Sequence, residues 1–175
     1  MEIKGRKAKV LITEQEIKEK VKELAKKVSK DYSGEEVFVV GVLKGAFIFM
    51  ADFVRELDGN IKLDFVQLSS YHTEMESSGE VIFVKDLSID VEGKNILVVD
   101  DIIDTGRTLL AFVEVLEKRG AKSVKTCVLL DKRERREVDY NADYYGFVIP
   151  DKFVIGYGLD WGEEGRTLKD IYAIE

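Results

Sequence analysis

The chain has 175 residues, of which 45% are hydrophobic and 35% are charged, and its formal net charge is -7. This length and apolar content are sufficient for one compact domain without disulfides or structural metal. The negative charge argues against a protein that mainly grips a nucleic-acid backbone, which needs a broad basic face. Any anionic ligand must therefore be held locally.

Cys127 is the single cysteine of the chain and lies in the apolar run TCVLL. A disulfide within the chain is therefore impossible, and we expect a buried, reduced thiol. The first residues, MEIKGRKAKVLITEQ, lack the apolar core of a signal peptide, and no stretch approaches the roughly 20 apolar residues that span a bilayer. We expect a soluble, cytoplasmic protein with neither membrane nor nucleic-acid partners.

The first third of the chain predicts a helix, a strand and a second helix. Thr13 and Glu16 have the spacing of a capping box, and apolar residues then recur at helical intervals over 17–28. The run VFVVGV (37–42) is short, continuous and rich in β-branched residues, which is typical of a buried strand. The following LKGAFIFMADFVREL predicts a turn into the second helix.

The middle of the chain predicts a βαβ unit preceded by a strand and a loop. IKLDFVQLSS (61–70) predicts the strand, and YHTEMESSGE (71–80) lacks periodicity, as surface loops do. NILVV (95–99), RTLLAFVEVLEKRG (107–120) and SVKTCVLL (123–130) then predict strand, helix and strand, which implies a parallel pair. After the charged loop DKRERREVDYNAD come two short apolar runs, YYGFVI and FVIGYG. Because no repeat or linker interrupts the pattern, we expect one α/β domain over residues 1–175.

The segment ILVVDDIIDTGRT (96–108) combines an apolar strand, an acidic cluster and a turn suited to anions. Its three acids are Asp100, Asp101 and Asp104. Ligands of parallel α/β folds bind beyond the carboxyl ends of the strands, where the backbone amides of a helix start attract anions. Gly106 permits close approach, and the hydroxyls of Thr105 and Thr108 add donors. Neither GxxxxGK[ST] nor GxGxxG is present, which disfavours common mononucleotide and dinucleotide loops.

The like charges of the acidic cluster should raise one another's pKa unless a ligand satisfies them, and a sugar diol with hydrated Mg²⁺ would do so. A solvated loop, or Asp104 as a helix N-cap, is the simpler alternative. A prenyl-synthase DDxxD motif is disfavoured, because that motif lies within long helices whereas this one ends a strand.

VVDDIIDTGRTL resembles the signature of the type I phosphoribosyltransferases. LKGAFIFMADFVREL, SSY, SSGEV, LLDKRERR and PDKFVIGYGLDW are similar, in order from Val37 to Arg166, to the hypoxanthine-guanine branch. The resemblance implies the type I fold, with a mainly parallel central sheet flanked by helices. It also implies a small hood, built from the N-terminal segment and residues 150–175, and a flexible lid loop at 71–80.

The resemblance further implies an activity. Such enzymes join a 6-oxopurine, hypoxanthine or guanine, to 5-phosphoribosyl 1-pyrophosphate and release pyrophosphate with IMP or GMP, which is purine salvage. Mg²⁺ is the implied cofactor, and a homodimer or homotetramer is the implied assembly.

The resemblance assigns the acidic segment to the ribose and its 5′-phosphate. Asp100 and Asp101 would hold the ribose hydroxyls. The 5′-phosphate loop would comprise Asp104, Thr105, Gly106, Arg107 and Thr108. Asp104 would also face purine N7 as the general base. Many members have Glu in place of Asp100 and Lys in place of Arg107, and both changes keep the charge.

The pyrophosphate would lie against the turn after the strand at 37–42. Leu43, Lys44 and Gly45 match a loop whose peptide bond before the lysine is commonly strained or cis, and Arg166 matches a further pyrophosphate-binding cation. Without the resemblance, this turn would be an ordinary strand-to-helix connection with a surface lysine. The implied metal ligands are Asp160, Asp100 and Asp101.

The purine would be held by Lys132, which donates to the 6-oxo group, by Phe153, which stacks on the base, and by Val154 and Asp160 at its edge. Periodicity alone would make Phe153 and Val154 core residues. It would also make Lys132 a solvated member of a charge run, as we expect for Arg133, Arg135 and Arg136. Gly165 replaces a more usual aromatic residue. Ser70 and Tyr71 would begin the lid, which excludes water from the reaction.

Two alternatives stay open at this point. Some proteins with this signature are regulators that bind RNA or DNA, which the net charge of -7 and the retained Lys132, Phe153 and Asp160 disfavour. Another base preference, for xanthine or adenine, is a closer alternative, because the backbone around 154–160 sets it.

Overall fold

The computed structural model describes residues 1–69 and 81–175. Its helices are α1 (Glu14–Asp31), α2 (Phe47–Glu56), α3 (Arg107–Lys118) and the 3-10 helix η1 (Arg133–Arg135). Its strands are β1 (Glu2–Ile3), β2 (Arg6–Ile12), β3 (Glu36–Leu43), β4 (Asn60–Leu68), β5 (Phe83–Lys85), β6 (Asn95–Ile103), β7 (Ser123–Asp131), β8 (Tyr144–Val148), β9 (Val154–Ile155) and β10 (Ile171–Ile174).

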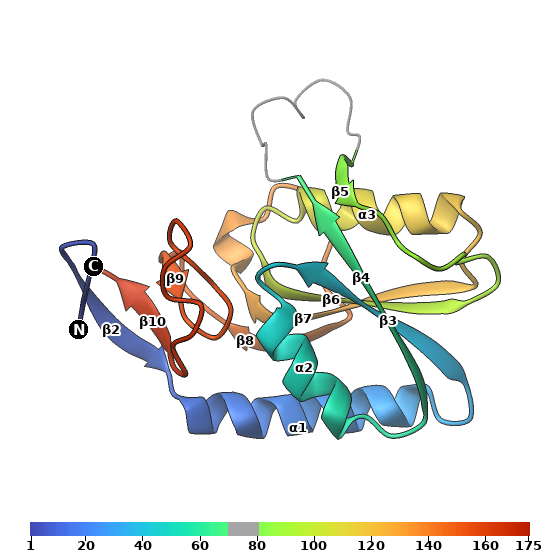
Figure 1. Cartoon of the computed structure of the whole chain (residues 1–175), viewed down its shortest axis with the longest axis horizontal. Helices are drawn as coiled ribbons and strands as arrows, with labels where there is room; N and C mark the ends of the chain where they lie inside the picture. The colour runs from blue at the N-terminus through green and yellow to red at the C-terminus, as the bar shows by residue number, and fades with distance from the viewer. Residues whose placement is uncertain (70–80) are drawn as a thin grey trace.

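The main sheet has six strands in the order β5-β4-β3-β6-β7-β8. All neighbouring pairs are parallel except β4 and β5, which are antiparallel. Helices α1 and α2 cover one face of this sheet and α3 covers the other (Figure 1). The predicted α/β fold with a mainly parallel, helix-flanked sheet is confirmed.

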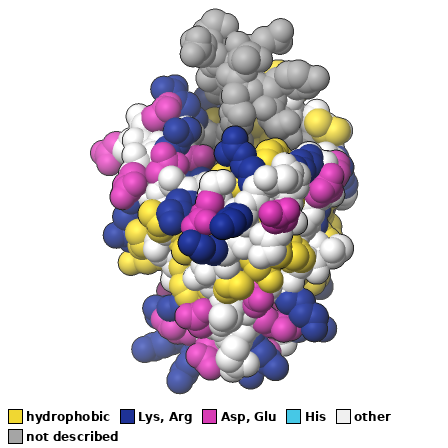
Figure 2. Space-filling model, turned by 90° about the vertical axis from the view of Figure 1, so that its left-hand side faces the viewer, with side chains coloured by type: hydrophobic (Ala, Val, Ile, Leu, Met, Phe, Trp, Pro, Cys, Tyr) yellow, Lys and Arg dark blue, Asp and Glu magenta, His cyan; other side chains and the backbone are white. Residues whose placement is uncertain are grey.

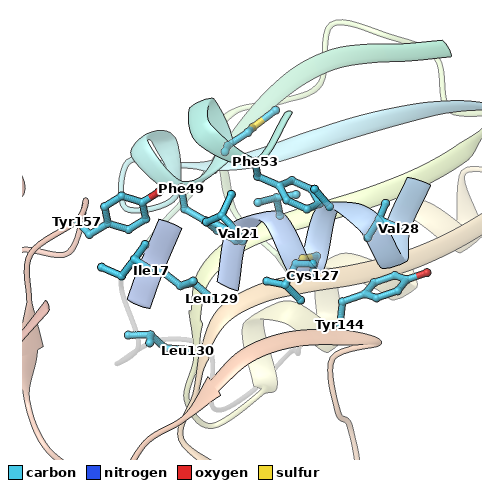
Figure 3. Packing of buried hydrophobic residues seen from close by; sticks show 14 of the residues in the cluster. Ile17, Val21, Val28, Phe49, Phe53, Cys127, Leu129, Leu130, Tyr144 and Tyr157 are labelled. Carbon is cyan, nitrogen blue, oxygen red and sulfur yellow. The ribbon is translucent and has the colours of Figure 1, made fainter. Parts of the chain in front are cut away.

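Side chains of β6 alternate between the two halves of the core. Leu97 and Val99 pack with α1 and α2, whereas Ile96 and Val98 pack with α3. Figure 3 shows the first half, where Val21 of α1 and Phe49 of α2 lie close together over the sheet. Residues 96–99 of this central strand are therefore all apolar, because both faces of the sheet are covered there.

Two predicted boundaries are wrong. The strand predicted over 95–99 continues to Ile103, so Asp100 and Asp101 lie within β6 and not in a turn, because β7 continues to pair with it, for example between Asp100 and Val128. The helix predicted to end at Gly120 ends at Lys118, since Gly120 has a left-handed φ of 87°. The predicted capping box of α1 is confirmed, with mutual hydrogen bonds between Thr13 and Glu16.

Cys127 of β7 is completely buried, as predicted. Burial raises the pKa of its thiol well above the ordinary value, because the thiolate would lose its hydration. The side chain lies in the core between α1 and the main sheet (Figure 3). Cys127 is therefore a packing residue.

A smaller sheet of four strands, in the order β1-β2-β10-β9, joins the two ends of the chain. It occupies the place of the expected hood, and both termini lie in it (Figure 1). Figure 2 views the molecule from this side, where basic and acidic side chains are interspersed. Within residues 1–69 and 81–175, no helix is long and apolar enough to cross a membrane.

Candidate active site

The site forms where three neighbouring parallel strands end. Lys44 directly follows β3, Asp104 directly follows β6, and Lys132 directly follows β7. Because β3, β6 and β7 are adjacent and parallel, these three residues lie at the same edge of the sheet. This is the edge at which α/β proteins bind their ligands.

Two adjoining cavities open at this edge. One, of about 590 Å³, is lined by ten residues of particular interest: Lys44, Gly45, Asp101, Asp104, Lys132, Phe153, Val154, Asp160, Glu163 and Arg166. The other, of about 790 Å³, is lined by the segment 100–109 and by Arg135 and Glu137, among others. Asp101 and Asp104 border both cavities. Every predicted site residue within the described ranges therefore lies in one continuous cleft.

The neighbouring carboxyl groups of Asp100 and Asp101 form an acidic pair that lines this cleft. Burial raises the pKa of Asp100 well above its ordinary value, and the neighbouring Asp101 charge raises it further. Burial also raises the pKa of Asp101, although the hydrogen bond with Asp100 and the Arg166 charge oppose this. The pair thus carries an electrostatic penalty that a cation or hydroxyl donors would relieve.

The turn after β6 presents backbone amides at the start of α3. Gly106 is the N-cap with a φ of 83°, and no side chain caps this helix end. Asp104 is therefore not the N-cap, and that alternative is wrong. Its carboxylate instead accepts a hydrogen bond from Arg135 Nε at 3.2 Å, while Arg107 forms an ion pair with Glu137. The first amide of α3, that of Arg107, donates to Thr105 Oγ1 at 3.3 Å, and the amides of Thr108 and Leu109 follow it at the helix start, where anions are attracted.

The turn after β3 packs tightly between the acidic pair and the segment that connects β9 to β10. The Leu43–Lys44 peptide bond is cis, which is one of the geometries common in the family loop that this turn resembles. A Cβ atom at Gly45 would overlap the Asp101 carboxylate, and a Cβ atom at Gly158 would overlap the Gly45 carbonyl oxygen. Both glycines are needed for this close approach.

Two further residues that line the cleft are the buried Lys132 and the exposed Phe153. Lys132 is only 8% exposed, and its backbone N–H donates to the Ile103 carbonyl at 3.0 Å. The alternative interpretation of Lys132 as a solvated member of a charge run is therefore wrong. Phe153 is 50% exposed and is not a core residue, whereas Val154 is buried. The ring of Trp161 meets Phe153 edge-on, with centroids 5.8 Å apart.

Arg136 was expected to be a solvated member of a charge run, and this is wrong. Its guanidinium pairs with the buried carboxylate of Asp131 and donates to the carbonyl oxygens of Asp104 (3.3 Å) and Tyr140 (2.9 Å). A Cβ atom at Gly106 would touch its Cδ. Arg136 therefore joins the end of β7 to the predicted phosphate turn. Charge-run composition gave no sign of this, because the contacts depend on the fold.

Glu163 is a further site residue that the sequence interpretation missed. Its carboxylate lies 3.3 Å from Lys44 Nζ and 3.4 Å from Arg166 Nη2, and Arg166 also pairs with Asp160 at 3.1 Å. These hydrogen bonds, Arg166 first and then Lys44, lower the pKa of Glu163. The i,i+3 spacing of Glu163 and Arg166 was the available signal, but the contact with Lys44 spans 119 positions.

Ser70, Tyr71 and the lid loop at 71–80 lie outside the described residues. Among the residues that are described, no group of three or more His, Cys, Asp or Glu side chains is arranged to hold a metal ion. Asp100, Asp101 and Asp160 therefore do not form a complete metal cage by themselves.

The chain matches known phosphoribosyltransferases over most of its length. The family model described as "Phosphoribosyl transferase domain" matches residues 10–161. The hypoxanthine-guanine phosphoribosyltransferase of Aquifex aeolicus is 55% identical over 175 residues, covering 99% of this chain and 98% of its own. That of Bacillus subtilis is 49% identical over 167 residues, covering 95% and 93%.

A solved structure agrees with these matches. The crystal structure of a Bacillus anthracis hypoxanthine-guanine phosphoribosyltransferase, with a HEPES molecule in the active site, superimposes with a TM-score of 0.92 at 44% identity, covering 97% of this chain and 99% of the other. The fold, the cleft and these relatives agree, and we conclude that the chain belongs to the hypoxanthine-guanine branch of the phosphoribosyltransferases, the pentosyltransferases of purine salvage.

Proposed function

We propose that this enzyme transfers the 5-phosphoribosyl group from phosphoribosyl pyrophosphate to hypoxanthine or guanine, with Mg²⁺, giving IMP or GMP. The observation that carries the base preference is the Lys132 ammonium. It projects from a buried residue that lines the cleft, and no side chain in the described ranges forms an ion pair or hydrogen bond with it. A lone donor suits a 6-oxo acceptor and disfavours the 6-amino group of adenine.

The rest of the cleft divides between the base and the sugar. Phe153 offers an exposed ring on which a purine stacks, and the backbone of Val154 and the carboxylate of Asp160 lie along the same wall. Asp100 and Asp101 hold the ribose hydroxyls. The amides at the start of α3, with Thr105, Gly106, Arg107 and Thr108, hold the 5′-phosphate. Asp104 borders both cavities, so it can accept the proton from purine N7.

Pyrophosphate leaves toward Lys44, Gly45 and Arg166. The positive charges of Lys44 and Arg166 and the backbone amide of Gly45 stabilise its negative charge. Because these groups are held on two segments, the turn after β3 and the connection between β9 and β10, positioning and electrostatics supply most of the rate. An oxocarbenium-like transition state would react with water, so water has to be excluded, and Ser70 and Tyr71 are our assignments for that role.

Mg²⁺ fits the donor set of the cleft. It prefers oxygen ligands and usually combines one or two carboxylates with water and substrate oxygens, so an incomplete protein cage is what it requires. Asp100, Asp101 and Asp160 would hold it together with the substrate. When bound, the ion would neutralise charge that develops on the pyrophosphate.

We also propose a domain organisation, a cellular compartment and an oligomeric state for this chain. The small sheet shares one core with α1 and the main sheet through Val154, Ile171 and Ala173, which supports a single domain over 1–175. The buried, reduced Cys127 suits the cytoplasm. A homodimer or homotetramer is the assembly that the family resemblance suggests, and sedimentation of the purified protein tests it.

The test of the proposed activity is a spectrophotometric assay with phosphoribosyl pyrophosphate and Mg²⁺, in which hypoxanthine, guanine, xanthine, adenine and uracil are offered separately. We expect formation of IMP and GMP that EDTA abolishes, and little reaction with adenine or uracil. Equal turnover of adenine and hypoxanthine would remove Lys132 from its assigned role.

A further inference from the structure

The two cations assigned to pyrophosphate share one carboxylate oxygen of the protein itself. Oε1 of Glu163 lies 3.3 Å from Lys44 Nζ and 3.4 Å from Arg166 Nη2. Lys44 comes from the turn after β3, whereas Glu163 and Arg166 come from the segment between β9 and β10. A single side chain therefore bridges two parts of the cleft at the point where the leaving group must bind.

The surrounding backbone holds Glu163 in this place. Its backbone φ of 69° lies in the left-handed region, which residues other than glycine rarely adopt. Its backbone N–H donates to Asp160 Oδ2 at 2.8 Å. The same residue thus contacts an assigned metal ligand through its backbone and both assigned cations through its side chain.

The Glu163 side chain is 66% exposed, so its ion pairs are weak and reversible. An incoming ligand with several negative charges would compete for both cations at once. A ligand with a single phosphate would gain less from the same cations, yet it would still have to displace a tethered carboxylate, whose effective concentration is high.

We propose that Glu163 is an affinity- and specificity-determining residue, which occupies the pyrophosphate-binding cations in the substrate-free enzyme and has to leave them when a diphosphate binds. It thereby disfavours phosphate and other small anions relative to the diphosphate of the substrate, and it assists departure of pyrophosphate by returning to Lys44 and Arg166. This proposal rests on the proposed function, which places the diphosphate at these cations.

Glu163→Gln and Glu164→Gln provide a matched pair of variants. Both remove one negative charge from an exposed glutamate of the same loop, but Glu164 lies near Lys4, at 3.8 Å, and makes no contact with Lys44 or Arg166. Long-range electrostatic effects should therefore be nearly equal in the two variants. The difference in ligand affinity between the two variants therefore measures the effect of the direct contacts of Glu163 with Lys44 and Arg166.

The measurement is calorimetric titration of each enzyme with Mg²⁺-pyrophosphate and, separately, with inorganic phosphate. We expect Glu163→Gln to bind pyrophosphate about 3- to 10-fold more tightly than wild type, as release of two exposed ion pairs predicts. Phosphate affinity should rise by a larger factor than pyrophosphate affinity, and an equal rise for the two ligands would overturn the assignment of specificity to Glu163. Glu164→Gln should stay within about twofold of wild type for both ligands.

Weaker pyrophosphate binding by Glu163→Gln would overturn the proposal and make Glu163 part of the diphosphate site. Equal gains in both variants would also overturn it, since they would reflect net charge alone. Lys44→Met separates this failure from a failure of the proposed function. If wild type binds pyrophosphate and Lys44→Met does so with equal affinity, the assignment of Lys44 itself is wrong, and the inference fails with it.

Discussion

Gly45 lies directly against Asp101, so closely that a Cβ atom at position 45 would overlap the Asp101 carboxylate. This contact joins the turn after β3 to the acidic pair of β6. The proposed pyrophosphate and ribose sites therefore share one rigid boundary.

Gly45→Ala should separate these two parts of the cleft. We expect kcat/KM for phosphoribosyl pyrophosphate to fall by at least about tenfold, because small displacements of positioned groups are costly in catalysis. Steady-state kinetics measures this. Gly34→Ala is the control, since its Cβ atom meets nothing within 4 Å and only its positive φ is strained. Similar losses of activity in both variants would show that the Gly45 contact has no special role.

Asp100→Asn should stabilise the ligand-free fold while it impairs the enzyme. The mutation removes one of two partly buried carboxyl groups whose pKa values burial raises, and the new amide can donate to Asp101. We expect a gain of about 0.5–2 kcal/mol in the free energy of unfolding, with lower activity. Thermal unfolding in EDTA at pH 7 measures the gain. A lower melting temperature than wild type would mean that the acidic pair is not under strain.

Arg136→Gln should destabilise the fold far more than Arg133→Gln. Both arginines pair with Asp131, which is 1% exposed, but the Arg136 side chain is 11% exposed and that of Arg133 is 51% exposed. Breaking the buried pair should cost about 3 kcal/mol, and breaking the exposed one less than about 1 kcal/mol. Urea unfolding of both variants measures this difference, and equal costs would contradict it.

Trp161 should report occupation of the base site, because it is the single tryptophan and meets Phe153 edge-on. Stacking of a purine on Phe153 changes the surroundings of both rings. We expect IMP or GMP to change the Trp161 fluorescence, and Phe153→Ala to weaken nucleotide binding by roughly 1–3 kcal/mol, the usual value of base–aromatic stacking. A fluorescence titration that is unchanged in Phe153→Ala would exclude stacking on this ring.

The parts of the site that follow a strand along the chain were accessible from the sequence. Asp104 and Lys44 each follow an apolar run, and parallel strands bring such positions to one edge. The strand end itself was misplaced, because Asp100 is polar but still pairs with Val128 of β7, and the pairing continues beyond Asp101 at Ile102 and Ile103. Pairing across the sheet overrode the local pattern.

The parts that depend on contacts between distant segments were not accessible. Nothing in the run KRERR distinguishes Arg136, which is buried against Asp131, from Arg133, which is half-exposed. The position of Glu163 beside Lys44 depends on how the segment between β9 and β10 folds back onto the turn after β3. Such contacts are set by tertiary packing, and local spacing carries no record of them.

The central claim is that the segment 100–108 is the catalytic centre, with Asp104 as its general base. The most direct test is Asp104→Asn, assayed for turnover of hypoxanthine and for the dissociation constant of phosphoribosyl pyrophosphate. We predict that turnover falls by about 10²-fold or more while the dissociation constant changes by only a few-fold, because general-base catalysis contributes on the order of 10²–10⁴. Near-native turnover would contradict the account and remove Asp104 from the base role.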